Sequence, residues 1–251
     1  MGFRFHQGIG RTLIGLCTVA AVHAIELPDI QKTQEAVIAK LKARPDCLVW
    51  YDMRDPTAQK LRFIPGPDKG VLTPKPGRWP GQEATGVFLG KLMREAIHIP
   101  DSGFTLCCWL RVNDLQKVDR LGHKRLAGGV MAVGSGYYNG WRLSVNPGSS
   151  ALSFGLGRPE IGSRRLASTG YLTSGTWHHV AVTWDHETLA MWIDGTLRAE
   201  TVATTAYHGE PTAKWFRIGE CDSGVGVLDF DIADVAFFSD VLPAETLMDL
   251  G

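Results

Sequence analysis

The chain has 251 residues, of which 44% are hydrophobic, and this is enough to bury a sizeable core in one large domain or two small ones. Basic and acidic side chains both number 26, and the first 24 residues contain two arginines and no acid. The remainder therefore has a formal charge of −2, which indicates neither a nucleic-acid partner nor an anionic membrane.

The N-terminus has the organisation of a secretory signal peptide. Arg4 and Arg11 form a basic region, residues 13–22 are apolar, and the segment ends in Val-His-Ala, whose modest side chains a signal peptidase accepts. The apolar run is too short to span a bilayer, and nothing downstream has the pattern to cover it as a buried helix. We predict cleavage after Ala24 and a secreted, periplasmic or cell-surface protein with no membrane span left. The expected division is a signal peptide (1–24), a helical segment (25–45) and one main domain (46–251).

The first part of the mature chain combines a helix and a strand. Apolar residues recur near one face of residues 28–43, which predicts a helix that packs on the main domain as a lid or spacer before Pro45 ends it. Cys47–Tyr51 is the first predicted strand. Residues 55–80 are rich in proline and glycine and predict a long loop.

Short strand patterns follow at regular intervals, separated by turn residues, which is typical of a β-sandwich or barrel. The predicted strands cover residues 87–89, 96–99, 103–112, 125–133, 141–145, 151–156, 163–167, 214–220 and 228–238. Residues 243–250 predict a short C-terminal helix. No helix between the first and last strands is long enough for a βαβ crossover, so a parallel α/β sheet is excluded.

The strongest local pattern is a three-stranded meander over residues 175–198. The strand Trp177–Trp184 is apolar on both faces, which predicts a central strand. In the next strand, residues 189, 191 and 193 fall on one face and Ala190 and Trp192 on the other. The Asp194-Gly195 pair supplies the positive φ angles of a type I′ turn into the third strand.

Four cysteines remain after signal cleavage: Cys47, Cys107, Cys108 and Cys221. An even number in an oxidising compartment predicts disulfides and allows three pairings. Cys107 and Cys108 are adjacent in a strand and point to opposite faces, so they do not bond each other. The alternative is that one or more of the four are small buried thiols.

Six segments, in family order, resemble laminin-G-like and pentraxin-like jelly rolls of the concanavalin A-like lectin/glucanase superfamily. They are residues 104–109, 140–145, 176–184, 192–195, 231–235 and 242–247. The resemblance covers residues 47–250 and implies an all-β fold, an antiparallel two-sheet β-sandwich with an N-terminal helix and a short C-terminal helix. It says far less about function.

The resemblance to pentraxins also implies a calcium site. The segment 179–184 resembles the pentraxin signature but has Ala181 in place of its second cysteine, so the family disulfide from the position of Cys107 cannot form. The loop 219–224 resembles the calcium-binding loop of that family. Glu220 and Asp222, with help from Asp229, are therefore candidate Ca²⁺ ligands. The alternative is a solvated acidic turn.

Enzymes of the same superfamily imply a glycosidase alternative. Asp229, Asp231 and Asp234 resemble the carboxylates of laminarinase-like enzymes, but Asp234 joins the face of the other two only if a β-bulge intervenes. Shortening the outer two glutamates to aspartate also widens the separation of 5–5.5 Å, approximately, that retaining catalysis needs. The segment fits the non-catalytic laminin-G ending better, so we expect no enzyme activity. The adjacent pair His178 and His179 cannot chelate one metal ion together.

A glycine-rich loop offers a candidate glycan site. Tyr137, Tyr138 and Trp141 supply aromatic faces that can stack on a sugar, and Asn139 can hydrogen-bond its hydroxyls. Trp141 also matches a core position of the family. The first hypothesis is an exported, non-catalytic module that binds a carbohydrate or glycoprotein, with calcium as a candidate cofactor. The second is a structural or adhesion domain with an extracellular protein partner, and the third is a divergent glycosidase.

Overall fold

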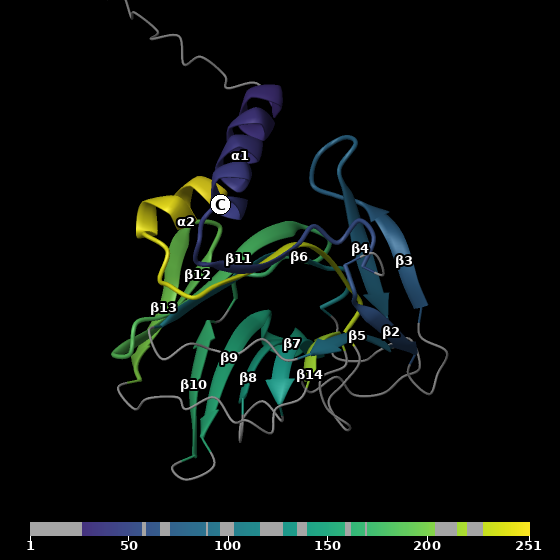
Figure 1. The fold of residues 1–251 in the computed structure, drawn as a ribbon. Coiled ribbons are helices and arrows are strands. Elements are labelled where there is room, and N and C mark those ends of the chain that lie inside the picture. Colours follow the sequence, from purple (N-terminus) through teal and green to yellow (C-terminus); the bar gives the residue numbers. More distant parts are fainter. Residues whose placement is uncertain are drawn as a thin grey trace, which may run out of the picture.

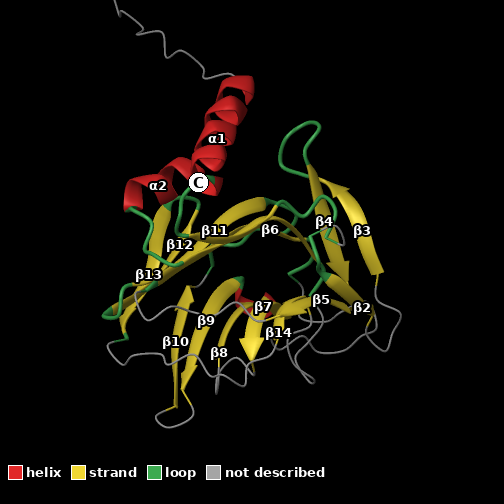
Figure 2. Cartoon of the chain, in the orientation of Figure 1, coloured by secondary structure: helices red, strands yellow, loops and turns green. Residues whose placement is uncertain are grey.

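A computed structural model of the chain describes residues 27–56, 59–65, 71–88, 90–95, 103–115, 128–134, 140–158, 162–168, 170–203, 215–219 and 228–251. These residues form two antiparallel sheets stacked as a sandwich, with both helices above one sheet (Figures 1 and 2). The predicted fold class is therefore confirmed. No helix within these ranges is long and apolar enough to cross a membrane.

The two sheets interleave strands from distant parts of the chain. Sheet A contains β1 (Cys47–Tyr51), β3 (Val71–Pro76), β4 (Glu83–Phe88), β6 (Phe104–Val112), β11 (Trp177–Trp184), β12 (Thr188–Ile193), β13 (Thr196–Val202) and β15 (Phe230–Phe238). Sheet B contains β2 (Arg62–Pro65), β5 (Gly90–Glu95), β7 (Gly128–Gly134), β8 (Gly140–Asn146), β9 (Ala151–Arg158), β10 (Gly162–Ser168) and β14 (Trp215–Gly219), and the short 3₁₀ turn η1 (Pro147–Ser149) joins β8 to β9. The order in sheet A is β13-β12-β11-β6-β15-β4-β3, with β1 also paired to β15, and the order in sheet B is β10-β9-β8-β7-β14-β5-β2.

Aromatic side chains fill the centre of the core between the sheets. Phe104 stacks on Phe237 with ring centroids 5.7 Å apart, and Trp141 lies 6.0 Å from Phe154 and 6.3 Å from Phe237. Aromatic pairs of this kind add about 0.5–1.5 kcal/mol each beyond the area that they bury. These contacts hold β6 and β15 of sheet A against β8 and β9 of sheet B.

The meander folds as its pattern predicts. β11 is a central strand between β12 and β6. Leu189, Met191 and Ile193 point into the core between the sheets, whereas Trp192 packs on the opposite face. The turn between β12 and β13 has φ +50° at Asp194 and +68° at Gly195, as a type I′ turn requires.

Both helices lie on the outer side of sheet A, and α1 rises away from the sheet (Figure 1). α1 (Leu27–Lys42) and α2 (Ala244–Leu250) contribute Leu41, Leu247 and Leu250 to an apolar cluster with Cys107 and Phe238 of the sheet. A helix with one apolar face is stable only when that face is buried, and this cluster supplies the partner surface. The N-terminal helix predicted at residues 28–43 is therefore present and packed on the domain.

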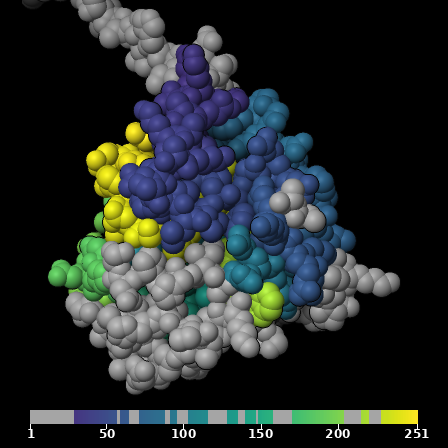
Figure 3. Space-filling view, viewed as in Figure 1, coloured from purple at the N-terminus to yellow at the C-terminus, as the bar shows by residue number. Residues whose placement is uncertain are grey.

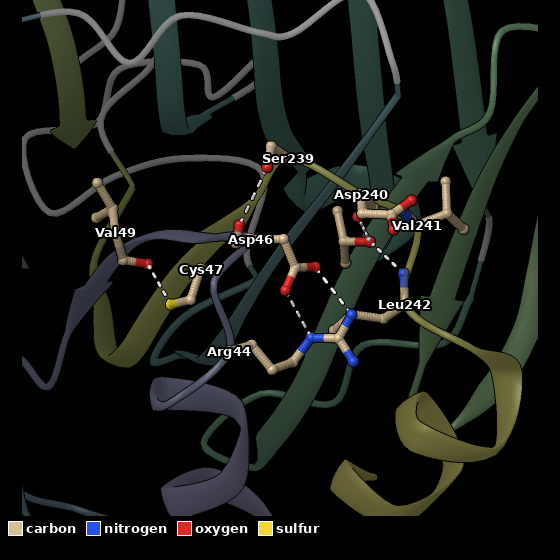
Figure 4. A network of polar contacts seen from close by, with 9 residues as sticks. Arg44, Asp46, Cys47, Val49, Ser239, Asp240, Val241 and Leu242 are labelled. Carbon is tan, nitrogen blue, oxygen red and sulfur yellow. Dashed lines mark hydrogen bonds and ion pairs between the residues drawn. The ribbon is translucent and has the colours of Figure 1, made fainter.

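A polar network fixes the start of β1 beside the end of β15 (Figure 4). The Arg44 guanidinium donates two hydrogen bonds to the Asp46 carboxylate at 2.8 and 2.9 Å, and the Ser239 backbone N–H donates to the Asp46 carbonyl at 2.9 Å. At the residue after Ser239, the Asp240 carbonyl accepts a hydrogen bond from the hydroxyl of Thr105 at 2.9 Å. The connection between α1 and β1 is thereby held against the end of β15, just before α2.

One sequence prediction needs correction, and another falls on residues that the structure does not describe. The proline-rich segment 55–80 is not one long loop, because it contains β2 and β3. Both strands lie at the edge of a sheet, where Pro74 and Pro76 are tolerated because an edge strand can leave backbone positions without a ladder donor. In the next segment the strand is Gly90–Glu95, while the predicted strand at 96–99 lies outside the described residues.

The cysteines that the structure describes are not cross-linked. Cys47, Cys107 and Cys108 are free thiols, and Cys221 lies outside the described residues. Cys108 belongs to the core between the sheets, whereas Cys107 belongs to the cluster under the helices. The two adjacent cysteines therefore do point to opposite faces, and the expected disulfide is not found among these three residues.

Candidate ligand-binding site

Sheet A forks along one edge of β15. This edge pairs with β4 at Phe230–Ile232 and with β1 further along the strand, and β6 lies on the other edge. The pairing with β6 shifts between Ala233 and Ala236, and Asp234 has φ +45°, which marks a β-bulge. Ile232 and Val235 both point into the core, so Asp231 and Asp234 share the outer face. The β-bulge that the glycosidase alternative requires, to bring Asp234 onto the same face as Asp231, is therefore present.

Asp234 occupies the fork and is only 7% exposed. Its Oδ1 accepts a hydrogen bond from Trp50 Nε1 at 3.2 Å, and its Oδ2 accepts one from Gln82 Nε2 at 3.2 Å. The Nη2 atom of Arg78 lies 3.6 Å from Oδ2. Burial raises the pKa of Asp234, and the charge of Arg78 opposes part of that rise.

Arg78 lies on the hairpin loop between β3 and β4 and is buried over an indole ring. Its side chain is 4% exposed, and its guanidinium carbon is 3.7 Å from the ring centroid of Trp109. Trp79 lies on the same loop with its ring centroid 5.5 Å away. None of the three guanidinium nitrogens has a hydrogen-bond partner among the residues that the structure describes. Burial lowers the pKa of Arg78 to about 10.

His179 extends this stack on the outer face of sheet A. Its ring centroid is 5.3 Å from that of Trp109, and the residue is 2% exposed. Burial, with a further contribution from the charge of Arg78, lowers the pKa of His179 to about 3. The imidazole is therefore neutral at physiological pH.

A groove of about 410 Å³ lies beside this stack. One wall is α1 and the other is the β3–β4 hairpin, which stand apart above sheet A in Figure 1. Figure 3 shows the same side of the molecule with α1 in purple and the β3–β4 region in blue. Eight of its twelve lining residues are polar or charged: Gln31, Glu35, Lys42, Asp52, Arg54, Gln82, Glu83 and Asp234. The volume is in the range of small-ligand sites in proteins.

Asp231, the middle carboxylate of the glycosidase alternative, is enclosed by neighbouring groups. Both Nε and Nη2 of Arg111 bond to Oδ2 of Asp231, at 2.8 and 2.7 Å, and Asp231 is 1% exposed. An added Cβ at Gly86 would come within 2.8 Å of the other oxygen of Asp231. A glycosidic bond cannot approach a carboxylate that is enclosed in this way.

The predicted sugar-stacking residues divide into two groups. Trp141 is 0% exposed in the core, so its ring is not available at the surface and it acts as a packing residue. Tyr137, Tyr138 and Asn139 lie outside the described residues.

Of the predicted calcium ligands, the structure describes only Asp229. Its Oδ1 accepts a hydrogen bond from Asn113 Nδ2 at 3.1 Å, and its carbonyl accepts the Asn113 backbone N–H at 2.9 Å. Glu220 and Asp222 lie outside the described ranges. Within those ranges, no group of three or more His, Cys, Asp or Glu side chains is arranged to hold a metal ion.

Sequence reasoning missed the central pair of this site, Arg78 and Trp109. Trp109 appeared only as part of a strand motif, and Arg78 lies in the segment that was predicted to be a loop. The available signal was local: Gly77 and Pro80 bracket an Arg-Trp pair, which places two large side chains at a tight turn.

The sandwich with a forked sheet and two helices on its outer face defines the class of protein, a jelly-roll domain. The Laminin_G_3 family model, described as the concanavalin A-like lectin/glucanases superfamily, matches residues 91–248. This match covers more than half of the chain, so the chain belongs to that superfamily. The resemblance carried by the sequence motifs is confirmed. No curated protein matches the chain in sequence.

Solved structures with a similar fold include binding domains of bacterial toxins. The binding domain of Paraclostridial Mosquitocidal Protein 1 has a TM-score of 0.61 and 13% identity, over 78% of this chain and 48% of that one. The binding domain of botulinum neurotoxin DC, in complex with SialylT, has a TM-score of 0.56 and 14% identity over 76% and 46% of the two chains. The same domain in complex with rat synaptotagmin II gives 0.57 and 13%, over the same shares. The chain spans about half the length of these structures, and at such identities the likeness shows the fold alone.

Proposed function

We propose that this protein is an exported, non-catalytic module that binds a carbohydrate or glycoprotein surface in the groove between α1 and the β3–β4 hairpin. The observation that carries the proposal is the groove itself, about 410 Å³ in volume, with both hydrogen-bond donors and acceptors on its walls. Sugar hydroxyls donate and accept at once, so such a mixed lining is complementary to them. The complexes of botulinum neurotoxin DC with SialylT and with synaptotagmin II are consistent with a binding role for the fold.

A glycan array probed with the mature chain tests the proposal. Binding to a glycan should be lost when Gln82 and Glu35, on opposite walls of the groove, are both replaced by alanine. Glu200→Ala, at an exposed position on β13, serves as the control and should bind normally. Loss of binding in Tyr137→Ala/Tyr138→Ala but not in the groove variant would move the site to the loop 134–140.

The second hypothesis, a structural or adhesion domain with a protein partner, predicts no glycan binding by any variant. The third, a divergent glycosidase, predicts release of reducing sugar from β-glucans. The enclosure of Asp231 by Arg111 argues against the third. The array and the sugar-release assay together separate all three hypotheses.

Calcium and export are parts of the proposal with tests of their own. A Ca²⁺ ion held by Glu220, Asp222 and Asp229 would raise the melting temperature relative to a sample with chelator. A ligand present at about 100 times its Kd adds about 2.7 kcal/mol to the stability of the folded state. Mass spectrometry of the exported protein should give an N-terminus at Ile25, and an intact Met1 would exclude the predicted cleavage.

A further inference from the structure

We propose that Trp109 and Asp234 form a cation-binding site, that the chain's own Arg78 occupies this site when no ligand is bound, and that the ammonium group of an amino sugar entering from the groove displaces Arg78. The inference rests on the proposed function, because it names the class of sugar that the groove would select. It makes the β3–β4 hairpin an autoinhibitory element of the site.

The geometry around Arg78 is that of a receptor for a cation. An indole face on one side and a carboxylate on the other are the two groups that bind organic cations most strongly in proteins. The guanidinium carbon lies 3.7 Å from the ring centroid of Trp109, and Nη2 lies 3.6 Å from the carboxylate of Asp234. The first distance shows that the guanidinium stacks closely on the indole ring of Trp109.

The guanidinium of Arg78 nevertheless lacks hydrogen bonds in this position. A guanidinium has five N–H donors, and none of its nitrogens has a hydrogen-bond partner within the described part of the chain. The 3.6 Å separation from Asp234 is too long for a hydrogen bond. The side chain is 4% exposed, so its hydration is lost without the usual compensation. Its lowered pKa, about 10, reflects the same cost of burial.

The hydrogen bonds of the loop that contains Arg78 are mainly within the loop itself and to Asp234. The Gly77 backbone N–H donates to the Gln82 carbonyl at 2.7 Å, and the Arg78 backbone N–H donates to Gln82 Oε1 at 3.1 Å. Gln82 Nε2 then donates to Asp234, so one carboxylate anchors both the loop and the guanidinium. Because the β3–β4 pairing ends at Pro76 and Glu83, a ligand that takes over Asp234 can release the loop 77–82 without breaking the ladder between the strands.

The groove leads a cation toward this carboxylate. Asp234 lines the groove as well as contacting Arg78. The lining has four acidic and two basic side chains, a formal charge of −2. Asp52 is paired with Arg54 at 2.8 Å, which leaves Glu35 and Glu83 on opposite walls to attract a positive charge.

The test is a binding titration of the mature chain with a glucosamine tetramer at mildly acidic pH, where its amines are protonated. The N-acetylglucosamine tetramer has the same backbone without the charges, and tetralysine has charges without a sugar. The wild type should prefer the glucosamine tetramer to its N-acetyl form. Arg78→Gln should raise affinity for the glucosamine tetramer about five- to tenfold, because the competing internal cation is removed. Asp234→Asn should abolish the preference.

Arg62→Gln, at an exposed position of β2 outside the groove, is the matched control, since it changes the net charge by the same amount without vacating the ring of Trp109. An equal rise in affinity in both arginine variants would overturn the inference, because bulk charge would then explain it. Equal binding of the two sugar tetramers would overturn the inference while leaving carbohydrate binding intact. Binding of tetralysine alone, or of no probe, would overturn the amino-sugar assignment, whereas the glycan array decides the carbohydrate function separately.

A melt provides a test that does not depend on the sugar. Methylguanidinium matches the end group of arginine and should fill the site vacated in Arg78→Ala. Millimolar methylguanidinium chloride should raise the melting temperature of Arg78→Ala relative to the same concentration of sodium chloride, and should not do so for the wild type. The absence of any difference between the two proteins would show that Trp109 and Asp234 are not a cation receptor.

Discussion

Oδ2 of Asp194 lies 2.7 Å from Nδ1 of His178, and Oδ1 of the same carboxylate accepts the backbone N–H of His179 at 2.9 Å. The other ring nitrogen of His178, Nε2, accepts the backbone N–H of Thr173 at 3.0 Å. Because Nε2 accepts this bond, Nδ1 is the ring nitrogen that donates to Asp194. Burial acts to raise the pKa of Asp194, but the bonds from the two histidines outweigh it and the pKa is lowered. One turn residue thus joins β11 to the β12–β13 turn.

Replacing this carboxylate should weaken the meander. Asp194→Asn keeps a residue that tolerates the positive φ but removes the charge, and we expect a loss of about 1 kcal/mol because the carboxylate is partly exposed. Urea unfolding followed by tryptophan fluorescence measures the change. Glu200→Gln, at an exposed position of β13, should leave the midpoint unchanged. An Asp194→Asn midpoint equal to that of the wild type would mean that the turn is held by its backbone alone.

The buried His179 should make the protein sensitive to acid. Its pKa is about 3 in the folded state against 6.5 for an ordinary histidine, so as the pH falls below 6.5 the unfolded chain binds a proton that the folded chain does not. The free energy of unfolding should therefore fall by about 1.4 kcal/mol per pH unit from this group between pH 6.5 and 3. Asp234, whose pKa is raised, acts in the opposite direction, since its contribution is lost as the pH rises through its folded pKa.

Urea unfolding at several pH values over that window measures this dependence. His179→Phe keeps a ring against Trp109 and should reduce the dependence of the unfolding free energy on pH. His186→Asn, at a partly exposed turn, should leave that dependence unchanged. Equal slopes for the wild type and His179→Phe would show that another group controls the response to acid.

Arg78 and Asp234 should be strongly coupled in stability. Asp234→Asn leaves a buried guanidinium without its counterion, and we expect a cost of about 3 kcal/mol. The double variant Arg78→Gln/Asp234→Asn removes both charges and should recover at least about 1 kcal/mol of that loss. A double-mutant cycle on urea midpoints checks the coupling. Costs that add to within about 0.5 kcal/mol would mean that the two groups act independently.

The described thiols should resist modification in the native state. Burial raises the pKa of Cys107, and it raises that of Cys108 to about 12. Because the thiolate is the reactive form, an aromatic disulfide reagent added to the native Cys221→Ser variant, in its mature form, should reach at most the half-buried Cys47. The same reagent should titrate all three thiols after unfolding without reductant. A titre of fewer than three would reveal a disulfide.

The fold could be predicted because local sequence patterns specify most of its strands and turns. Alternating apolar residues in β6, the doubly apolar strand β11 and the Asp194-Gly195 turn each specify a conformation from neighbours in the chain, and each was found as predicted. The prediction that failed was the long loop over residues 55–80. The prolines of β3 signal a loop unless it is known that the strand lies at an edge, and edge position is a property of the sheet.

The candidate site was decided by the tertiary structure. Gln82 and Asp234 are 152 positions apart, and no periodicity relates them. The sequence determined that Asp231 and Asp234 would lie in one strand and that only a bulge could give them a common face, but pairing with β4, β6 and β1 produces that bulge. The seating of Arg78 on Trp109 depends on how the hairpin folds back over sheet A. Strand patterns are set by neighbouring residues, whereas a site assembled from separate strands depends on which strands pair and where their register shifts.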